Sequence, residues 1–156
     1  MGNEKATDQF VRDLLRDIGV TKPWEQDGGP KWKRASLACG SKSKTGKAEG
    51  KPEFVFVVSD FIVIVEDKKE TRFTRFLEAG QVSTEFPYRQ DYALNGAVHY
   101  ANAMMRNGVP HSKGIFAVGI GGAEHHHEIT VAYIGQGMIK HLDNLVVRSI
   151  NTVTKS

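Results

Sequence analysis

The clearest pattern of apolar positions lies between Lys51 and Lys69, in the stretch KPEFVFVVSDFIVIVEDKK. Two short runs rich in Val, Ile and Phe, Phe54–Val58 and Phe61–Val65, flank the dipeptide Ser59-Asp60. Such residues favour β-strands, and neither run alternates apolar with polar, which indicates that both faces are covered. The stretch therefore predicts a central β-hairpin whose charged residues lie at its open end.

The register of this hairpin brings charged side chains together. A two-residue loop at Ser59-Asp60 would place Glu66 opposite Glu53, and directly opposed residues share a face with Cβ atoms about 4.5–5.5 Å apart. Lys68 would share that face, while Asp67 would point away. Two carboxylates this close repel one another unless a positive charge intervenes, and Mg²⁺ prefers such oxygen ligands. The hairpin end is therefore a candidate cation site.

Helical periodicity appears on both sides of the hairpin. The spacing of apolar residues predicts helices over Glu4–Ile18 and Asp91–Met105, and a weaker pattern favours a short helix over Trp32–Cys39. Further strands are expected at Lys113–Ile120 and Ile129–Ile134, followed by a last helix over His141–Thr152. This order predicts a single α/β domain over residues 1–156, with a mixed central sheet and helices on both faces.

One acid lies on the buried stripe of the first helix. Stepping back from Leu15 through Val11 at helical spacing reaches Glu4, and an acid on a buried stripe needs a partner. The alternative is an exposed acid in the first turn, which the helix dipole favours.

These features resemble a known family. Glu53, followed after twelve residues by Glu66-Asp67-Lys68, resembles the PD-(D/E)xK nuclease motif, with Glu53 in the position of the usual Asp. The stretches QFVRDLLRDIG, SKSKTGKAEGKPEFV and DYALNGAVHYA resemble, more narrowly, the N-terminal nuclease domains of restriction–modification enzymes. That group includes type I restriction subunits and nucleases fused to a DNA methylase. The resemblance implies a restriction-endonuclease-like core with its active site on the β-hairpin.

The resemblance also implies a set of site residues. Glu53 and Glu66 would hold Mg²⁺, with Mn²⁺ as a substitute, and the backbone carbonyl of Asp67 would be a third ligand. Glu4 corresponds in position to a first-helix glutamate that joins the metal site in many of these nucleases. Lys68 would orient the attacking water and offset charge on the phosphate. The implied activity is hydrolysis of DNA phosphodiester bonds.

Positive charge is concentrated before the hairpin. The net charge is only +3, but one segment holds seven basic residues against the single acid Glu49: Lys31, Lys33, Arg34, Lys42, Lys44, Lys47 and Lys51. Closely spaced lysines replace counterions on a polyanion, which favours a phosphate-contacting arm over a merely solvated loop. The residues that we expect to contact double-stranded DNA are Lys42, Lys44, Lys47, Lys51, Arg72, Asn95 and Tyr100.

Composition bears on membrane association and on the cellular compartment of the protein. The chain has no apolar run of transmembrane length and no signal-peptide core at its start, so we expect no membrane association. A single cysteine, Cys39, fits a reducing cytoplasm. No methyltransferase, helicase or target-recognition segment is visible. If the resemblance holds, such domains belong to a larger protein of which this chain is an N-terminal part, and dimerisation would permit double-strand cleavage.

Two other interpretations remain open at this point. The chain could be a non-catalytic DNA-binding or scaffolding module, which the Glu53 substitution favours and an absence of metal binding would support. It could also be a stand-alone repair or junction-resolving nuclease, which would cut branched DNA in preference to linear duplex.

Overall fold

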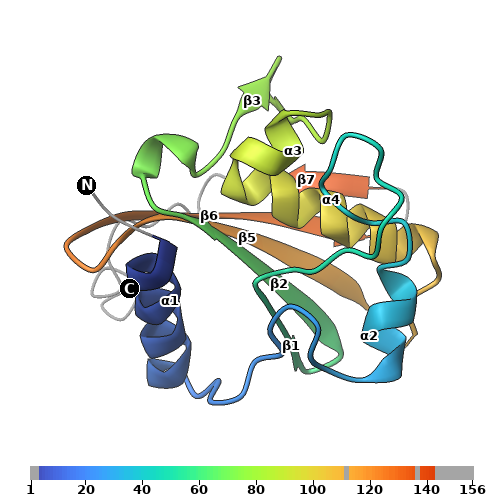
Figure 1. Cartoon of the computed structure of the whole chain (residues 1–156), viewed down its shortest axis with the longest axis horizontal. Helices are drawn as coiled ribbons and strands as arrows, with labels where there is room; N and C mark the ends of the chain where they lie inside the picture. The colour runs from blue at the N-terminus through green and yellow to red at the C-terminus, as the bar shows by residue number, and fades with distance from the viewer. Residues whose placement is uncertain (1–3, 111–112, 136–137, 143–156) are drawn as a thin grey trace.

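The computed structural model describes residues 4–110, 113–135 and 138–142 (Figure 1). Its elements in chain order are α1 (Glu4–Asp17), α2 (Lys31–Ser36), β1 (Phe54–Val58), β2 (Phe61–Lys68), the 3₁₀ turn η1 (Thr71–Phe73), β3 (Leu77–Glu78), β4 (Gln81–Val82), α3 (Tyr88–Asp91), α4 (Ala93–Arg106), β5 (Gly114–Ala123), β6 (His126–Gly135) and β7 (Met138–His141). The two long helices, the short helix α2 and the four strands predicted from the sequence are confirmed to within a few residues.

Two expectations for the periphery differ from the structure. The helix expected from residue 91 is divided, because Tyr92 adopts an extended conformation between α3 and α4. β7 was not predicted from the sequence, and it ends at His141, where the last helix was expected to begin. Most of that expected helix lies outside the described residues.

The five long strands form one sheet in the order β1-β2-β5-β6-β7. β2 and β5 are parallel, and the other neighbouring pairs are antiparallel, so the sheet is mixed, as predicted. The parallel pair requires a crossover connection, which α4 supplies between β2 and β5. β2 is therefore an interior strand, flanked on both sides by hydrogen-bonded partners.

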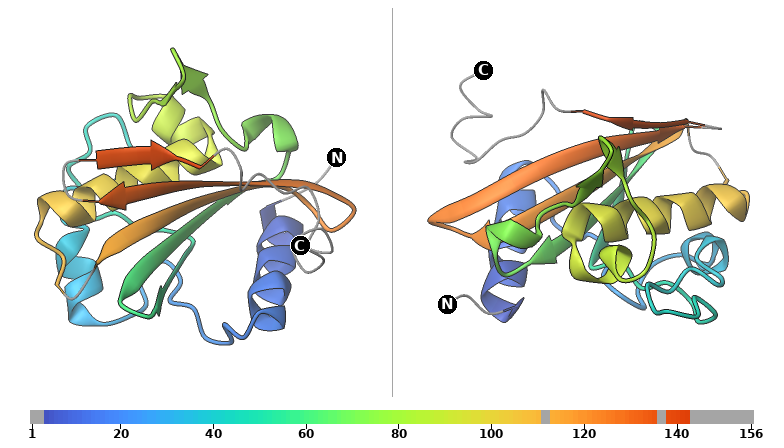
Figure 2. Two further views of the ribbon diagram at one scale, coloured as in Figure 1. Left: turned by 180° about the vertical axis from the view of Figure 1, so that it is seen from behind. Right: turned by 90° about the horizontal axis from the view of Figure 1, so that it is seen from above.

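Helices cover both faces of this sheet, which gives the α/β sandwich that the sequence predicts (Figures 1 and 2). On one face, α1 packs its buried residues Val11 and Leu15 against Val65 and Ile120. On the other face, α4 packs against the remaining core, which includes Ile64. Alternate residues of β2 thus enter two separate cores, as the two-residue period of a strand requires.

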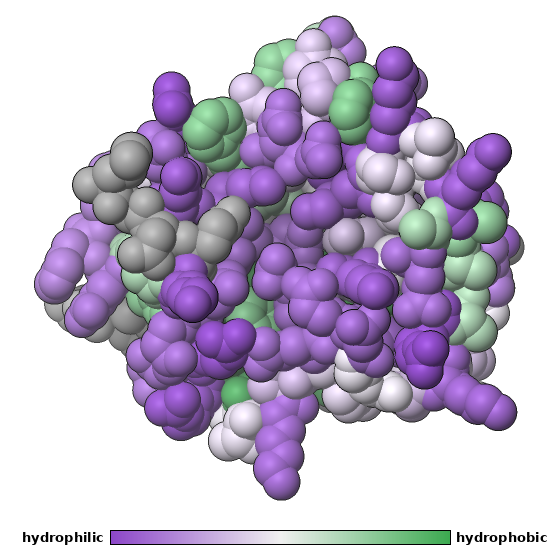
Figure 3. Space-filling view, in the orientation of Figure 1, coloured by the Kyte–Doolittle hydropathy of each residue, from purple (hydrophilic) through white to green (hydrophobic). Residues whose placement is uncertain are grey.

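The visible surface of Figure 3 is largely hydrophilic, with scattered apolar side chains. No helix in the described residues is long and apolar enough to cross a membrane.

Candidate active site

The β1–β2 hairpin has the register predicted from its loop. Val58 pairs with Phe61 and Phe54 pairs with Val65, so the turn consists of Ser59 and Asp60. Both turn residues have positive φ values, 46° and 72°, as a two-residue hairpin turn whose twist matches its strands demands. This register fixes which residues meet at the open end of the hairpin.

The charged end of β2 divides its side chains between the two faces of the sheet. Val65 belongs to the α1-side core and Ile64 to the α4-side core. Glu66 accordingly lies on the α4 side, and Asp67 lies on the α1 side. Both are almost fully buried, with 2% and 4% of their surface exposed. The two buried acids therefore point to opposite faces of the sheet from adjacent positions of one strand.

Glu66 has its charge neutralised by a lysine from a distant loop. Its Oε1 lies 2.6 Å from Lys42 Nζ, and its Oε2 accepts a 2.6 Å hydrogen bond from the backbone N–H of Glu53. The Lys42 ammonium also lies 5.6 Å from the centre of the Tyr100 ring. Burial alone would lower the pKa of Lys42, but the Glu66 carboxylate outweighs it and raises this pKa. The two residues therefore form a largely buried ion pair.

The loop that supplies Lys42, residues 41–47, is held against α3 and α4, and we call it the lysine loop. The Arg89 guanidinium donates hydrogen bonds of 3.2, 2.6 and 3.1 Å to the carbonyl oxygens of Lys42, Ser43 and Lys44. A Cβ atom at Gly96 of α4 would lie only 2.9 Å from Lys42 Cδ. Glycine at this position lets the lysine stem cross the helix on its way to Glu66.

The opposite face holds a cluster of three carboxylates, which we call the acidic cluster. Asp8 of α1, Glu53 and Asp67 each place a carboxylate oxygen within 4.8 Å of the other two. Among the described residues, no protein donor reaches either Asp67 oxygen or Asp8 Oδ1, but Asp67 lies close enough to Asp8 for the two carboxyl groups to share a proton. Arg12, on the same helix as Asp8, forms its ion pair with Glu25 instead, at 2.6 Å. No protein cation in the described part of the chain therefore pairs with Asp67.

Burial and mutual repulsion disfavour the charged forms of this cluster. Burial raises the pKa of Glu53 to about 7, and the charges of Glu66 and Asp8 add to the effect. Burial also raises the pKa of Asp67, with Asp8 and Glu53 contributing in the same direction. Two ionised carboxylates cannot donate hydrogen bonds to one another, so the cluster needs either protons or a bound cation. The residues present therefore fit a divalent cation with hard oxygen ligands.

This electrostatic arrangement predicts how stability depends on pH without metal. The pKa of Glu53 is about 7 in the folded protein against an ordinary value of 4.5. Between these two pH values the folded protein binds a proton that the unfolded chain has lost, so stability falls as pH rises. The shift corresponds to at most about 3 kcal/mol. We expect the Tm in EDTA to fall between pH 5 and pH 7.5, and Glu53→Gln to flatten this dependence. A Tm that rises across the same window would contradict the assignment.

The structure separates the residues that the sequence placed at one spot. Glu53 was expected to share a face with Glu66, but its carboxylate lies with Asp8 and Asp67, and only its backbone N–H contacts Glu66. The reason is that strand pairing ends at Phe54 and Glu53 lies in a bend, so the alternation of side chains does not reach it. Lys68, at the end of β2, has no hydrogen-bond or ion-pair partner among the described residues.

The expected DNA-contacting residues lie in different environments. Lys44 and Lys47 are exposed on the lysine loop, whereas Lys51 and Arg72 form ion pairs with Asp27 and Glu70 at 3.0 and 3.1 Å. Asn95 and Tyr100 are buried. The Asn95 side chain bonds the backbone of Phe76 and Ser83, and so fixes the segment between β2 and α4. All four of these basic side chains are exposed, so all four are accessible to a DNA backbone.

Sequence reasoning missed Asp8 and the side chain of Asp67. Glu4 begins α1, but its side chain lies outside the described residues; Asp8 follows one turn later on the same stripe. The signal was present, because Asp8 precedes Val11 by three residues and Leu15 by seven. For Asp67, the signal was its place at the end of a strand with both faces covered.

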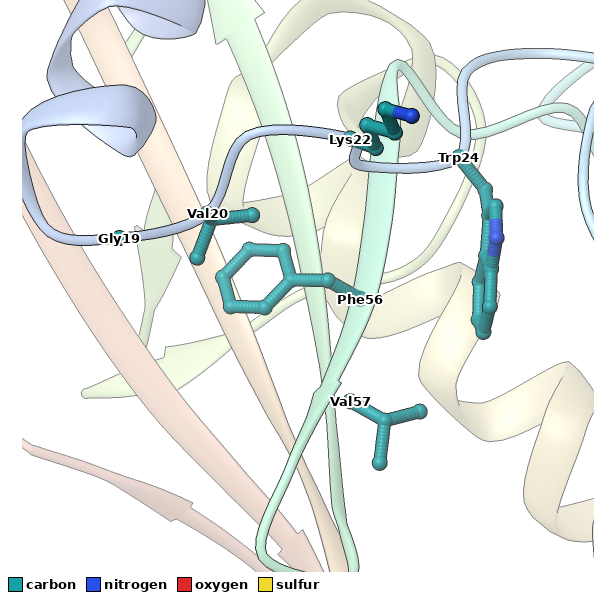
Figure 4. A pocket seen from close by; sticks show the side chains of 6 residues that line it. All are labelled: Gly19, Val20, Lys22, Trp24, Phe56 and Val57. Carbon is teal, nitrogen blue, oxygen red and sulfur yellow. The ribbon is translucent and has the colours of Figure 1, made fainter.

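A separate pocket of about 300 Å³ lies beside β1 (Figure 4). Its lining has no acidic residue and is mainly apolar: Gly19, Val20, Lys22, Trp24, Phe56 and Val57. It is therefore distinct from the acidic cluster.

Comparison with known proteins shows a similarity that extends over most of the chain. It is 38% identical, over 148 residues, to the type II restriction enzyme and methyltransferase RM.BcgI of Heyndrickxia coagulans. The match covers 93% of this chain but 23% of that protein, so the chain spans about a quarter of its relative's length. No family model matches the chain, and no solved structure matches it significantly. The chain is therefore similar to part of a protein named as both a restriction enzyme and a methyltransferase.

Proposed function

We propose that this chain is a metal-dependent DNA endonuclease domain of a restriction–modification system. The observation that carries the proposal is the acidic cluster at the open end of the hairpin, where no protein cation in the described part of the chain pairs with the buried carboxylate of Asp67. A site built from three carboxylates suits Mg²⁺ or Mn²⁺. The similarity to a restriction enzyme and methyltransferase supports DNA as the substrate class.

Different residues of the chain would bind the cation and contact the phosphate during hydrolysis. Asp8, Glu53 and Asp67 would hold the cation, which supplies Lewis-acid activation of the phosphate and of the attacking water. One of the two adjacent lysines, Lys68 or Lys69, would donate hydrogen bonds to the phosphate as negative charge builds up on it. The prediction that Glu66 is a ligand remains a prediction; in this structure both of its oxygens are already engaged.

The lysine loop would position the duplex. Lys44 and Lys47 project from a loop that Arg89 and Lys42 fasten to the body of the protein. Lysines so placed bind phosphates without reading the base sequence. Choice of sequence, and a methyltransferase partner, would therefore lie in other parts of a larger protein, as the name of the relative suggests.

Nicking of supercoiled plasmid tests the proposed function. We expect nicking by the wild type with Mg²⁺ or Mn²⁺ and none in EDTA, because the acidic cluster needs a cation to act. Glu53→Gln should reduce the rate by about 10²-fold or more, since an amide is a poorer ligand than a carboxylate. Plasmid binding without nicking under all metal conditions would contradict the proposal and support the scaffolding alternative.

A further inference from the structure

The end of β2 contains two overlapping acid–x–lysine sequences. Glu66 and Lys68 form one, and Asp67 and Lys69 form the other. A shift of one residue along a strand moves a side chain to the opposite face. The two acids therefore lie on opposite faces of the sheet, and contacts distinguish them.

The Glu66 face is closed by protein contacts. The Glu66 carboxylate is engaged by Lys42 and by the backbone of Glu53, both at 2.6 Å. Lys68 pairs in register with Gly121 of β5. A Cβ atom at Gly121 would collide with Thr74 Oγ1 and lie 2.8 Å from the Glu70 carbonyl oxygen. The segment that follows β2 thus folds back tightly over this face.

On the Asp67 face, by contrast, no protein cation engages the acid in the described part of the chain. The two oxygens of Asp67 are buried, and they point into the acidic cluster with Asp8 and Glu53. Lys68 is the last paired residue of β2, so alternation assigns its side chain to the Glu66 face; Lys69 follows in the bend beyond the strand and is not assigned to that face. Lys69 is half-buried and has no hydrogen-bond or ion-pair partner among the described residues. It is therefore available to contact a phosphate beside the cluster.

We propose that Asp67 and Lys69, rather than Glu66 and Lys68, are the ligand and the catalytic lysine, and that Glu66 is a positioning residue. Glu66 lies on the face of the sheet opposite to the acidic cluster. Held in place by Lys42, it accepts a hydrogen bond from the backbone N–H of Glu53 and so would set the direction of the Glu53 carboxylate. Lys69 would contact the substrate phosphate and would not bind the cation, because an ammonium has no lone pair. This inference rests on the proposed function.

Two adjacent lysines provide a matched test. Lys69→Met and Lys68→Met remove the same charge one residue apart, and the readouts are plasmid nicking with Mn²⁺ and Ca²⁺ binding by calorimetry. We expect Lys69→Met to slow nicking by about 10²–10⁴-fold. Its Ca²⁺ affinity should remain equal to or tighter than that of the wild type. Lys68→Met should nick within about threefold of the wild type. A greater loss for Lys68→Met, or equal rates in both variants, would overturn the assignment of the lysine.

Substitutions of the two acids test which of them is the cation ligand, and the readout is Ca²⁺ binding rather than cleavage. Asp67→Asn should weaken Ca²⁺ binding by about 10-fold or more, whereas Glu66→Gln, if folded by circular dichroism, should retain more of it. The opposite order would make Glu66 the ligand. Lys42→Arg provides a second test of the role of Glu66. It preserves the positive charge beside Glu66 and disturbs only the position of the Glu66 carboxylate. Unchanged nicking and unchanged Ca²⁺ affinity would show that Glu66 does not position Glu53. A wild type that binds Ca²⁺ but never nicks would contradict the proposed function alone.

Discussion

Lys42→Met is expected to destabilise the protein by about 3 kcal/mol, because it leaves the Glu66 carboxylate buried without its counter-charge. Only 2% of the Glu66 side chain is exposed, and Lys42 Nζ is its only charged partner among the described residues. Removing one member of a buried ion pair costs far more than removing a surface pair. Urea denaturation, followed by circular dichroism, measures the effect as a lower midpoint.

Lys44→Met is the matched control for this prediction. Lys44 lies two residues further along the same loop and is exposed, so its replacement should change the stability by no more than about 0.5 kcal/mol. Replacing both Lys42 and Glu66 with leucine should recover part of the loss, because no unpaired charge then remains. Equal midpoints for Lys42→Met and the wild type would mean that the pair does not hold the lysine loop in solution.

Asp67→Asn should have the opposite effect on the metal-free protein. At pH 8 in EDTA, we expect it to stabilise the fold by about 1–3 kcal/mol. Burial raises the pKa of Asp67, so the folded wild type must keep this carboxyl protonated at a pH where the unfolded chain ionises it, whereas an amide is neutral at every pH and still donates a hydrogen bond. The donor would face Asp8, whose carboxylate belongs to the same cluster. For a domain of this size, that change corresponds to a rise in Tm of roughly 3–10 °C.

The same substitution should abolish the response to metal. Mg²⁺ should raise the Tm of the wild type, because a ligand that binds only the folded state stabilises it, and should leave Asp67→Asn nearly unchanged. Asp17→Asn, an exposed acid at the end of α1, is the control and should respond to Mg²⁺ like the wild type. A lower Tm for Asp67→Asn in EDTA would mean that the Asp67 carboxylate is paired in a way that the structure does not contain.

Local patterns in the sequence were enough to predict the framework of the site. The two apolar runs around Ser59-Asp60 determined the hairpin and its register, because loop length fixes which residues pair. Helical spacing of apolar residues located α1 and α4, and the absence of alternation in β2 indicated a strand covered on both faces. Each of these features depends on neighbours in the chain.

The contacts that decide the chemistry are long-range and were not predictable in the same way. Lys42 and Glu66 are 24 residues apart, and their pairing depends on how Arg89 and Gly96 hold the lysine loop. The direction of the Glu53 carboxylate depends on where strand pairing stops, which no periodicity reveals. The sequence therefore located the charged end of the hairpin but did not show which carboxylates meet there.

Anomalous diffraction from crystals soaked in Mn²⁺ tests whether the acidic cluster binds a cation, because it locates the cation without requiring cleavage. We expect one strong peak among the carboxylates of Asp8, Glu53 and Asp67, and loss of that peak in Asp67→Asn. A peak on the other face of β2, bound by Glu66 with Lys42 displaced, would contradict the assignment of ligands. No peak at saturating Mn²⁺ would contradict the proposal that this domain is metal-dependent.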